Sequence, residues 1–364
     1  MAKEITNLNA GPAGLPRAAL ERAQRELLDF EGTGISIMEH SHRGKSYEKV
    51  QREAIQLTRE LMAVPDTHEI LLVQGGASQL FATVPMNFLT PDTSADYVLT
   101  GTWAKKAMAE AKFYGKTRVA GKGGEGDSFT RIPTQAELSL DPAARYVHIT
   151  SNNTIAGTQY QSFPDVGRVP LVADMSSDVM WRPIDVSKFA LIYAGAQKNI
   201  GPSGVVLVIV EKAFMESGRA DIPTIFRFKT HAENESMYNT PPTFGIYMMR
   251  NVLAVLKAEG GLSVIEAKNR EKSTMLYGAI DGSGGYYRSP VEVAARSHMN
   301  IVWRLPSEAL EDKFAKEAEA AGLIGLKGHR SVGGLRASTY NAVSVAGVAR
   351  LVEFMHGFQK ANPA

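Results

Sequence analysis

The sequence predicts an α/β protein with a mainly parallel sheet, followed by a smaller α+β unit. Its 364 residues exceed what one hydrophobic core ordinarily supports, so we expect two domains. Six short apolar runs lack the polar alternation of a half-exposed strand, which is typical of strands covered on both faces. Helical patterns separate several of these runs, as in a parallel sheet built from strand–helix–strand units.

The expected strands end in glycine or small polar residues, and ligands in such sheets bind at the carboxyl ends of strands. We therefore look for the functional site at these ends. In chain order, the expected strands cover residues 69–73, 97–99, 146–149, 169–172, 190–193 and 204–210.

Apolar residues at helical spacing predict the helices. Val50, Ala54, Leu57 and Leu61 form one apolar face of an expected helix over residues 47–64. A long amphipathic segment over 262–280 leads into the second unit, which begins near residue 270. The other expected elements are helices over 244–259, 307–321 and 342–359, and a strand over 300–305.

The composition excludes several classes of function. The net charge of only +2 gives no reason to expect nucleic acid or a membrane surface as a partner. The absence of cysteine excludes disulfides, thiolate zinc sites and cysteine nucleophiles, and no metal site is predicted. The longest apolar run, 205–210, is far below the ~20 residues of a membrane helix, and the N-terminus lacks a signal-peptide pattern. We expect a cytoplasmic protein.

Two residues after expected strands suggest chemistry. Lys198 follows strand 190–193 among small residues, where desolvation would lower its pKa and favour Schiff-base formation. Asp174 ends the run VPLVAD, and a carboxylate there needs a cationic or donating partner, such as a protonated pyridine nitrogen. The alternatives are a surface lysine in a turn and an aspartate that caps a turn.

Two further motifs complete a pattern. The segment 75–78 (GGAS) lies between a strand and a helix, where backbone N–H groups could hold a phosphate. Trp103 follows another strand end and could stack on an aromatic ring. A plain turn and a core tryptophan are the alternatives. Together with Lys198 and Asp174, these residues are what a protein contributes to a pyridoxal phosphate site.

The sequence resembles the phosphoserine aminotransferases, which are class V aminotransferases dependent on pyridoxal 5'-phosphate. The resemblance runs from end to end. The segments that carry it are AGPAGLP (10–16), SHRGKSY (41–47), QGGASQLFATVPMN (74–87), TGTWAKKA (100–107), SNNTIAGTQY (151–160), ADMSSD (173–178), AGAQKNIGPSG (194–204), NTPPTF (239–244) and GHRSVGGLRASTYNA (328–342).

The resemblance implies an aspartate-aminotransferase-like fold, also called PLP fold type I. It has a large cofactor-binding domain with a mainly parallel seven-stranded sheet and a smaller α+β C-terminal domain. We expect the large domain to cover residues 16–268 and the small domain residues 1–15 and 269–364. The resemblance also implies a homodimer with shared active sites.

The resemblance assigns roles to cofactor-binding residues. It makes Lys198 the Schiff-base lysine, Asp174 the partner of the pyridine nitrogen and Trp103 the stacking ring, and these three are the predicted catalytic residues. Near the phenolic oxygen it places Thr154. Around the cofactor phosphate it places Gly76, Ala77, Ser78 and Gln197, with Asn239 and Thr240 from the second subunit.

On the substrate side, the resemblance implies phosphoserine as ligand. Arg336 suits the α-carboxylate, because a guanidinium can hold a carboxylate through two parallel hydrogen bonds. Two His-Arg pairs, far apart in sequence, are expected to converge on the substrate phosphate. These pairs are His329 with Arg330, and His42 with Arg43 from the neighbouring subunit.

The implied reaction converts 3-phosphohydroxypyruvate and glutamate into phosphoserine and 2-oxoglutarate, in serine biosynthesis. The sequence leaves open whether the phosphohydroxythreonine step of pyridoxine biosynthesis is also catalysed. Two alternatives are another class V aminotransferase, acting on alanine, serine or glyoxylate, and a non-catalytic protein that binds a phosphorylated ligand. The two His-Arg pairs argue against the first, and an intact Lys198 and Asp174 argue against the second.

Overall fold

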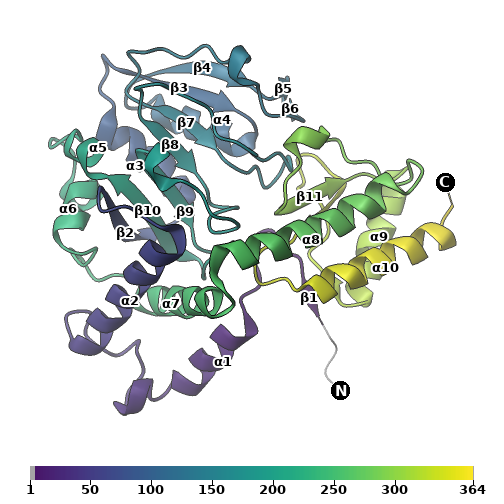
Figure 1. The fold of residues 1–364 in the computed structure, drawn as a ribbon, viewed down its shortest axis with the longest axis horizontal. Helices are drawn as coiled ribbons and strands as arrows, with labels where there is room; N and C mark the ends of the chain where they lie inside the picture. Colours follow the sequence, from purple (N-terminus) through teal and green to yellow (C-terminus); the bar gives the residue numbers. More distant parts are fainter. Residues whose placement is uncertain (1–4, 364) are drawn as a thin grey trace.

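The computed structural model describes residues 5–363 and is built around a seven-stranded sheet (Figure 1). Its strands are β2 (His68–Gly75), β3 (Ser94–Leu99), β4 (Lys116–Lys122), β7 (Val147–Thr150), β8 (Leu171–Asp174), β9 (Leu191–Gly195) and β10 (Gly204–Glu211). They lie in the order β2-β10-β9-β8-β7-β3-β4. Strand β10 is antiparallel to both of its neighbours, β2 and β9, and the other neighbouring pairs of the sheet are parallel. The predicted α/β fold with a mainly parallel sheet is confirmed.

Helices cover both faces of this sheet, because alternate side chains of each strand point to opposite faces. Ile70 and Leu72 pack in one apolar cluster with α2 (Lys45–Met62) and α7 (Thr243–Ala258). Leu71, between them, packs in a second cluster on the other face. The helices of that face are α3 (Ala77–Phe88), α4 (Thr102–Ala111), α5 (Lys212–Glu216) and α6 (Phe228–Glu233).

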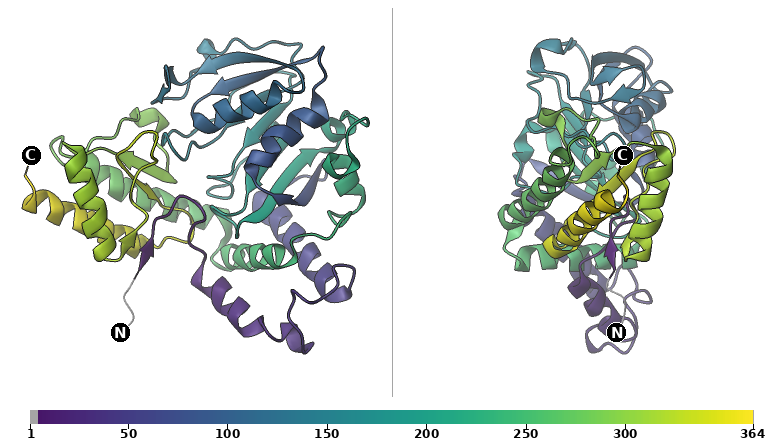
Figure 2. Two further views of the ribbon diagram at one scale, coloured as in Figure 1. Left: turned by 180° about the vertical axis from the view of Figure 1, so that it is seen from behind. Right: turned by 90° about the vertical axis from the view of Figure 1, so that its right-hand side faces the viewer.

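A third apolar cluster joins Leu8 to residues between 276 and 358. Its elements are α8 (Gly261–Asp281), β11 (Asn300–Trp303), α9 (Glu308–Ala320), β12 (Leu323–Ile324), β13 (Leu335–Ser338) and α10 (Val345–Ala361). The first strand, β1 (Thr6–Asn7), pairs with β12 and so brings the start of the described chain to this unit. Figure 2 shows the unit beside the sheet. The division at residues 15 and 268 stays a prediction.

The remaining elements are peripheral. The short strands β5 (Gly124–Glu125) and β6 (Ser128–Phe129) form a hairpin. Helix α1 (Arg17–Glu26) projects from the side opposite β4 (Figure 2). No helix within residues 5–363 is long and apolar enough to cross a membrane.

Several elements differ from the sequence expectations, and three of them have a clear physical reason. Strand β4 was not predicted, because it is an edge strand that exposes Lys116 and Lys122 and has no apolar run. Strand β13 was missed because it is short and polar at its centre. In α2 the buried face includes Thr58 and Met62, whereas the predicted Leu57 and Leu61 lie at its partly exposed margin.

Candidate active site

A cavity of about 290 Å³ lies at the carboxyl ends of β2, β8 and β9, against the C-terminal unit. Ala10 and Gly11, near the start of the described chain, and Arg336 of β13 also line it. Ten of the residues predicted to bind cofactor or substrate line this cavity: Gly76, Ala77, Ser78, Trp103, Thr154, Asp174, Gln197, Lys198, His329 and Arg336. The structure therefore brings together motifs that are up to 260 positions apart, from 76 to 336.

Lys198 is held at a defined position in this cavity. Its Nζ donates a hydrogen bond of 2.7 Å to Thr154 Oγ1 and lies 5.6 Å from the centre of the Trp103 ring. Burial lowers the pKa of Lys198 to about 8, Asp174 opposes this effect and Arg336 adds to it. The neutral, nucleophilic amine is consequently accessible close to neutral pH.

Asp174 is the last residue of β8 and is only 4% exposed. Its Oδ1 accepts hydrogen bonds from Ser176 N (2.9 Å) and Ser176 Oγ (2.6 Å), so it does cap a turn, as the alternative interpretation proposed. Its Oδ2 accepts no hydrogen bond from any residue in the described range 5–363 and borders the cavity. Burial raises the pKa of Asp174, whereas Lys198 and the bonds from Ser176 lower it.

The start of α3 provides an anion site. Gly76 is the N-cap residue, and no side chain caps the helix. A Cβ at Gly76 would meet nothing within 4 Å, so the space over the helix terminus is open. The N–H groups of Ala77 and Ser78 point along the helix toward this space, where the helix dipole favours a negative charge. Nearby, Trp103 Nε1 and Gln197 Oε1 are buried without a hydrogen-bond partner among the described residues.

Two residues of the C-terminal unit face the same cavity. Arg336, in β13, donates from Nη1 to the Thr154 carbonyl oxygen (3.0 Å), while its Nε is buried without an acceptor in the described part of the chain. His329 Nδ1 accepts from Ser331 N at 3.2 Å and lies 2.7 Å from Ser331 Oγ. A neutral His329 ring therefore carries its proton on Nε2. Burial and the nearby Arg336 lower the pKa of His329.

Five predicted residues do not line the cavity of their own chain. Arg330 is exposed next to His329. His42 and Arg43 precede α2, and Asn239 and Thr240 precede α7. The Nε2 atom of His42 is buried without a partner among residues 5–363.

Sequence reasoning missed three residues at the site. Ser176 holds Asp174 and also accepts a hydrogen bond from Gly195 N (3.1 Å). Gly11, with φ of +141°, passes so close to Lys198 that an added Cβ would lie 3.2 Å from its Cγ. Asp178 is buried behind Asp174, accepts from Ser151 Oγ and Gln159 Nε2, and has its pKa raised by burial to about 6. The motif ADMSSD contains Ser176 and Asp178 and was the available signal.

The family described as aminotransferase class-V matches residues 5–351. The chain belongs to this family. It is 51% identical to the phosphoserine aminotransferase of Lysinibacillus sphaericus (strain C3-41) over 99% of each chain, and 49% identical to that of Bacillus subtilis (strain 168) over 99% of each.

The fold is also similar to that of solved phosphoserine aminotransferase structures. The fold is similar to that of phosphoserine aminotransferase from Bacillus circulans subsp. alkalophilus, with a TM-score of 0.96, 50% identity, and coverage of 98% of this chain and 99% of that chain. It is also similar to the PLP-bound phosphoserine aminotransferase from Trichomonas vaginalis, with a TM-score of 0.92, 36% identity, and coverage of 97% of this chain and 100% of that chain.

The cofactor of this class-V aminotransferase is pyridoxal 5'-phosphate, and the cavity suits it. Asp174 Oδ2 is available to a ring nitrogen, and the uncapped start of α3 is available to a phosphate. Trp103 presents a ring near Lys198 and an indole N–H that lacks an acceptor in the described chain. One ligand that carries an aromatic ring, a ring nitrogen and a phosphate would pair with all of these groups. No group of three His, Asp or Glu residues in the described range could hold a metal ion.

Proposed function

We propose that this enzyme transfers the amino group of glutamate to 3-phosphohydroxypyruvate, giving O-phospho-L-serine and 2-oxoglutarate, in serine biosynthesis. One observation carries the proposal: Lys198 and Asp174 share their cavity with Arg336 and His329, so the transamination machinery and two groups suited to an anionic substrate occupy one site. About half of the residues are identical to those of phosphoserine aminotransferases, which supports this substrate.

Different residues of the cavity would bind different parts of the cofactor. Asp174 would pair with the ring nitrogen, Trp103 would stack on the ring, and the N–H groups of Ala77 and Ser78, with Gln197, would hold the phosphate. When bound, the cofactor supplies an aldehyde carbon for the amino group and a ring that accepts electrons. The negative charge on Asp174 keeps the ring nitrogen protonated.

Lys198 is the group that moves protons. Its Nζ accepts the proton from the substrate Cα and later returns a proton, which requires a neutral amine, and the lowered pKa of Lys198 favours that form. The hydrogen bond to Thr154 Oγ1 orients Nζ within the cavity. Because both partners lie on rigid turns that follow sheet strands, Nζ is positioned before the substrate arrives.

Residues of the C-terminal unit would bind the substrate, together with two residues of the second subunit. The free edge of the Arg336 guanidinium suits the α-carboxylate. His329 Nε2–H and the adjacent Arg330 would bind the substrate phosphate together with His42 and Arg43. A neutral amino-acid side chain would need none of the four groups assigned to the phosphate, and for this reason phosphoserine is favoured over serine or alanine.

A homodimer with shared sites accounts for the residues that do not line the cavity. The segment 27–40 precedes His42 and exposes apolar side chains, with Leu28 84% and Met38 52% exposed. Such a patch is typical of an interface. We assign to the second subunit the residues His42, Arg43, Asn239 and Thr240.

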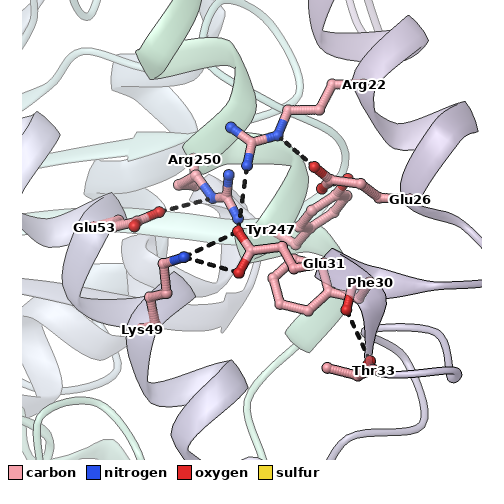
Figure 3. Close-up of polar contacts among 9 residues, drawn as sticks. All are labelled: Arg22, Glu26, Phe30, Glu31, Thr33, Lys49, Glu53, Tyr247 and Arg250. Atoms are coloured by element: carbon pink, nitrogen blue, oxygen red, sulfur yellow. Dashed lines mark hydrogen bonds and ion pairs between the residues drawn. The ribbon is translucent and has the colours of Figure 1, made fainter.

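Polar contacts join the helices α1, α2 and α7, and Glu31 links the segment 27–40 to them (Figure 3). Tyr247 Oη donates to Glu26 Oε2 (2.7 Å), which ties α1 to α7. Lys49 in α2 binds Glu31 through bonds of 2.8 and 3.0 Å. The buried Arg250 lies 3.3 Å from Glu53. Glu31 is the residue of the segment that these ion pairs reach, and through Lys49 it joins the segment to α2.

A substrate panel tests the proposed reaction. With 2-oxoglutarate as acceptor, we expect kcat/KM for phosphoserine to exceed that for serine and alanine by several orders of magnitude, because unpaired site cations penalise neutral substrates. Comparable values for alanine or serine would refute the assignment. Phosphohydroxythreonine in the same panel decides whether the pyridoxine step is also catalysed.

Subunit mixing tests the shared site. Lys198→Ala and Arg43→Ala homodimers should each be nearly inactive. When they are unfolded and refolded together in equal amounts, about half the dimers are mixed, and one site of each carries neither change. Recovery of about a quarter of wild-type activity is expected for an isologous dimer. No recovery after confirmed subunit exchange would place Arg43 in its own subunit's site.

A further inference from the structure

The loop 328–334, between β12 and β13, carries His329 and Arg330 and is closed by its own backbone. Gly328 N donates to Gly334 O (2.8 Å), and Val332 N and Gly333 N donate to His329 O (3.0 and 2.9 Å). Within residues 5–363, only two hydrogen bonds join this loop to other segments, one from Arg304 and one to Glu311. Its orientation therefore depends on these two residues.

The loop crosses the end of β11 in direct contact. Gly334 has φ of +69°, and a Cβ there would lie 2.8 Å from Trp303 O and 2.7 Å from Arg304 Cδ. Glycine is required at this crossing for both reasons. Arg304, the first residue after β11, then donates from Nη1 to Val332 O (3.0 Å).

Glu311 forms hydrogen bonds with both Arg304 and the loop 328–334. It lies near the start of α9 and is only 6% exposed. Its Oε1 accepts from Arg304 Nε (2.6 Å) and from Leu305 N (3.1 Å), and its Oε2 accepts from Gly334 N (3.2 Å). A single buried carboxylate thus binds the arginine that holds the loop and the backbone of the loop itself.

We propose that Glu311, acting with Arg304, is a positioning residue that holds the loop 328–334 in the conformation that presents His329 and Arg330 to the substrate phosphate. The inference rests on the proposed function, which assigns the phosphate to these two residues. Within residues 5–363, Glu311 forms no hydrogen bond with a cofactor-binding residue, so we expect its replacement to affect substrate binding and not cofactor binding.

Glu311→Gln removes the charge that Arg304 requires, and the loop loses the binding-competent conformation part of the time. If the competent fraction falls to about a tenth, the apparent dissociation constant for the phosphate-bearing substrate rises about tenfold. The maximal rate should stay unchanged, because Lys198 and Asp174 are not affected. Arg304→Lys keeps the charge but loses the second N–H for Val332 O, and a smaller rise is expected.

Asp281→Asn is the control for the loss of an ion-paired carboxylate. Asp281 forms a two-bond ion pair with Arg296 (2.6 and 2.8 Å) in the same part of the chain but does not contact the loop. All variants are compared by KM and kcat for phosphoserine and for glutamate. Hydrogen–deuterium exchange of the amides of residues 328–334 gives a readout that is independent of activity.

We expect Glu311→Gln to raise KM for phosphoserine about tenfold, with a clearly smaller change for glutamate, unchanged kcat and faster exchange in the loop. Asp281→Asn should change none of these. Faster exchange without a rise in KM for phosphoserine, or equal rises for both substrates, would overturn the inference. If Glu311→Gln does not fold, Arg304→Lys decides by the same criteria. A wild-type enzyme inactive on phosphoserine would instead refute the proposed function, and the inference with it.

Discussion

Replacing Ser176 with alanine tests how much the hydrogen bond from Ser176 Oγ to Asp174 contributes to catalysis. Ser176 Oγ donates to Asp174 Oδ1 (2.6 Å) and accepts from Gly195 N at the end of β9 (3.1 Å). The backbone N–H of Ser176 donates to the same Oδ1 (2.9 Å) and survives the substitution. The carboxylate therefore stays in place but loses one of two donors.

The size of the effect follows from these contacts. A hydrogen bond to a charged group contributes about 1.5–3 kcal/mol. Since about 1.4 kcal/mol corresponds to a tenfold change in rate, kcat should fall by roughly tenfold, with a hundredfold as the upper limit. Loss of the bond also raises the pKa of Asp174 further, because Ser176 is one of the groups that lower it. The acid limb of the kcat profile should therefore move to higher pH.

The assay is kcat as a function of pH, with Ser177→Ala as the control. Ser177 is equally buried and donates to Asn152 O (2.7 Å), but it does not contact Asp174. Both variants lose a buried hydroxyl, and both should lose stability. Only Ser176→Ala should move the acid limb. Identical pH profiles for the two variants would refute the role given to Ser176.

Three other predictions follow from the same geometry. In the cofactor-free protein, acylation of Lys198 should fall as the pH falls through about 8, because only the neutral amine reacts. Mass spectrometry of the peptide that contains Lys198 should show the midpoint of this fall near pH 8. A midpoint near 10.5 would contradict the buried position of Lys198. Arg336→Lys should raise KM for both amino-acid substrates, because an ammonium cannot form two parallel bonds to a carboxylate, and unchanged values would exclude Arg336 from that role. Arg330→Ala should raise KM for phosphoserine far more than for glutamate, by an amount corresponding to about 2–5 kcal/mol, and equal effects would move Arg330 out of the phosphate site.

Much of the fold could be predicted because the central strands are buried on both faces. Continuous apolar runs such as 204–210 are typical of strands in the interior of such a sheet. The polar residues that follow these strands lie together at one edge of the sheet. For this reason Lys198 and Asp174 could be predicted as candidate site residues, and both line the cavity. Arg336 could be assigned only through the resemblance, since β13 has no apolar pattern to mark it as a strand.

The site residues that could not be predicted from the sequence depend on contacts between distant segments. Ser176 matters because its hydroxyl bridges Asp174 and Gly195, which belong to neighbouring strands. Glu311 reads as an ordinary acidic residue in the first turns of a helix, where such residues are common. Its three hydrogen bonds reach residues 304, 305 and 334, and no local pattern predicts that arrangement.

The central claim is that Lys198 carries the cofactor of this enzyme. Borohydride reduction of the purified protein followed by proteolysis and peptide mass spectrometry tests it directly. We expect a single phosphopyridoxyl group on the peptide that contains Lys198, and none on the Lys198→Ala variant, although that variant should still bind cofactor through Asp174 and the start of α3. A label on another lysine, or no label on a protein that shows visible absorbance, would contradict the account.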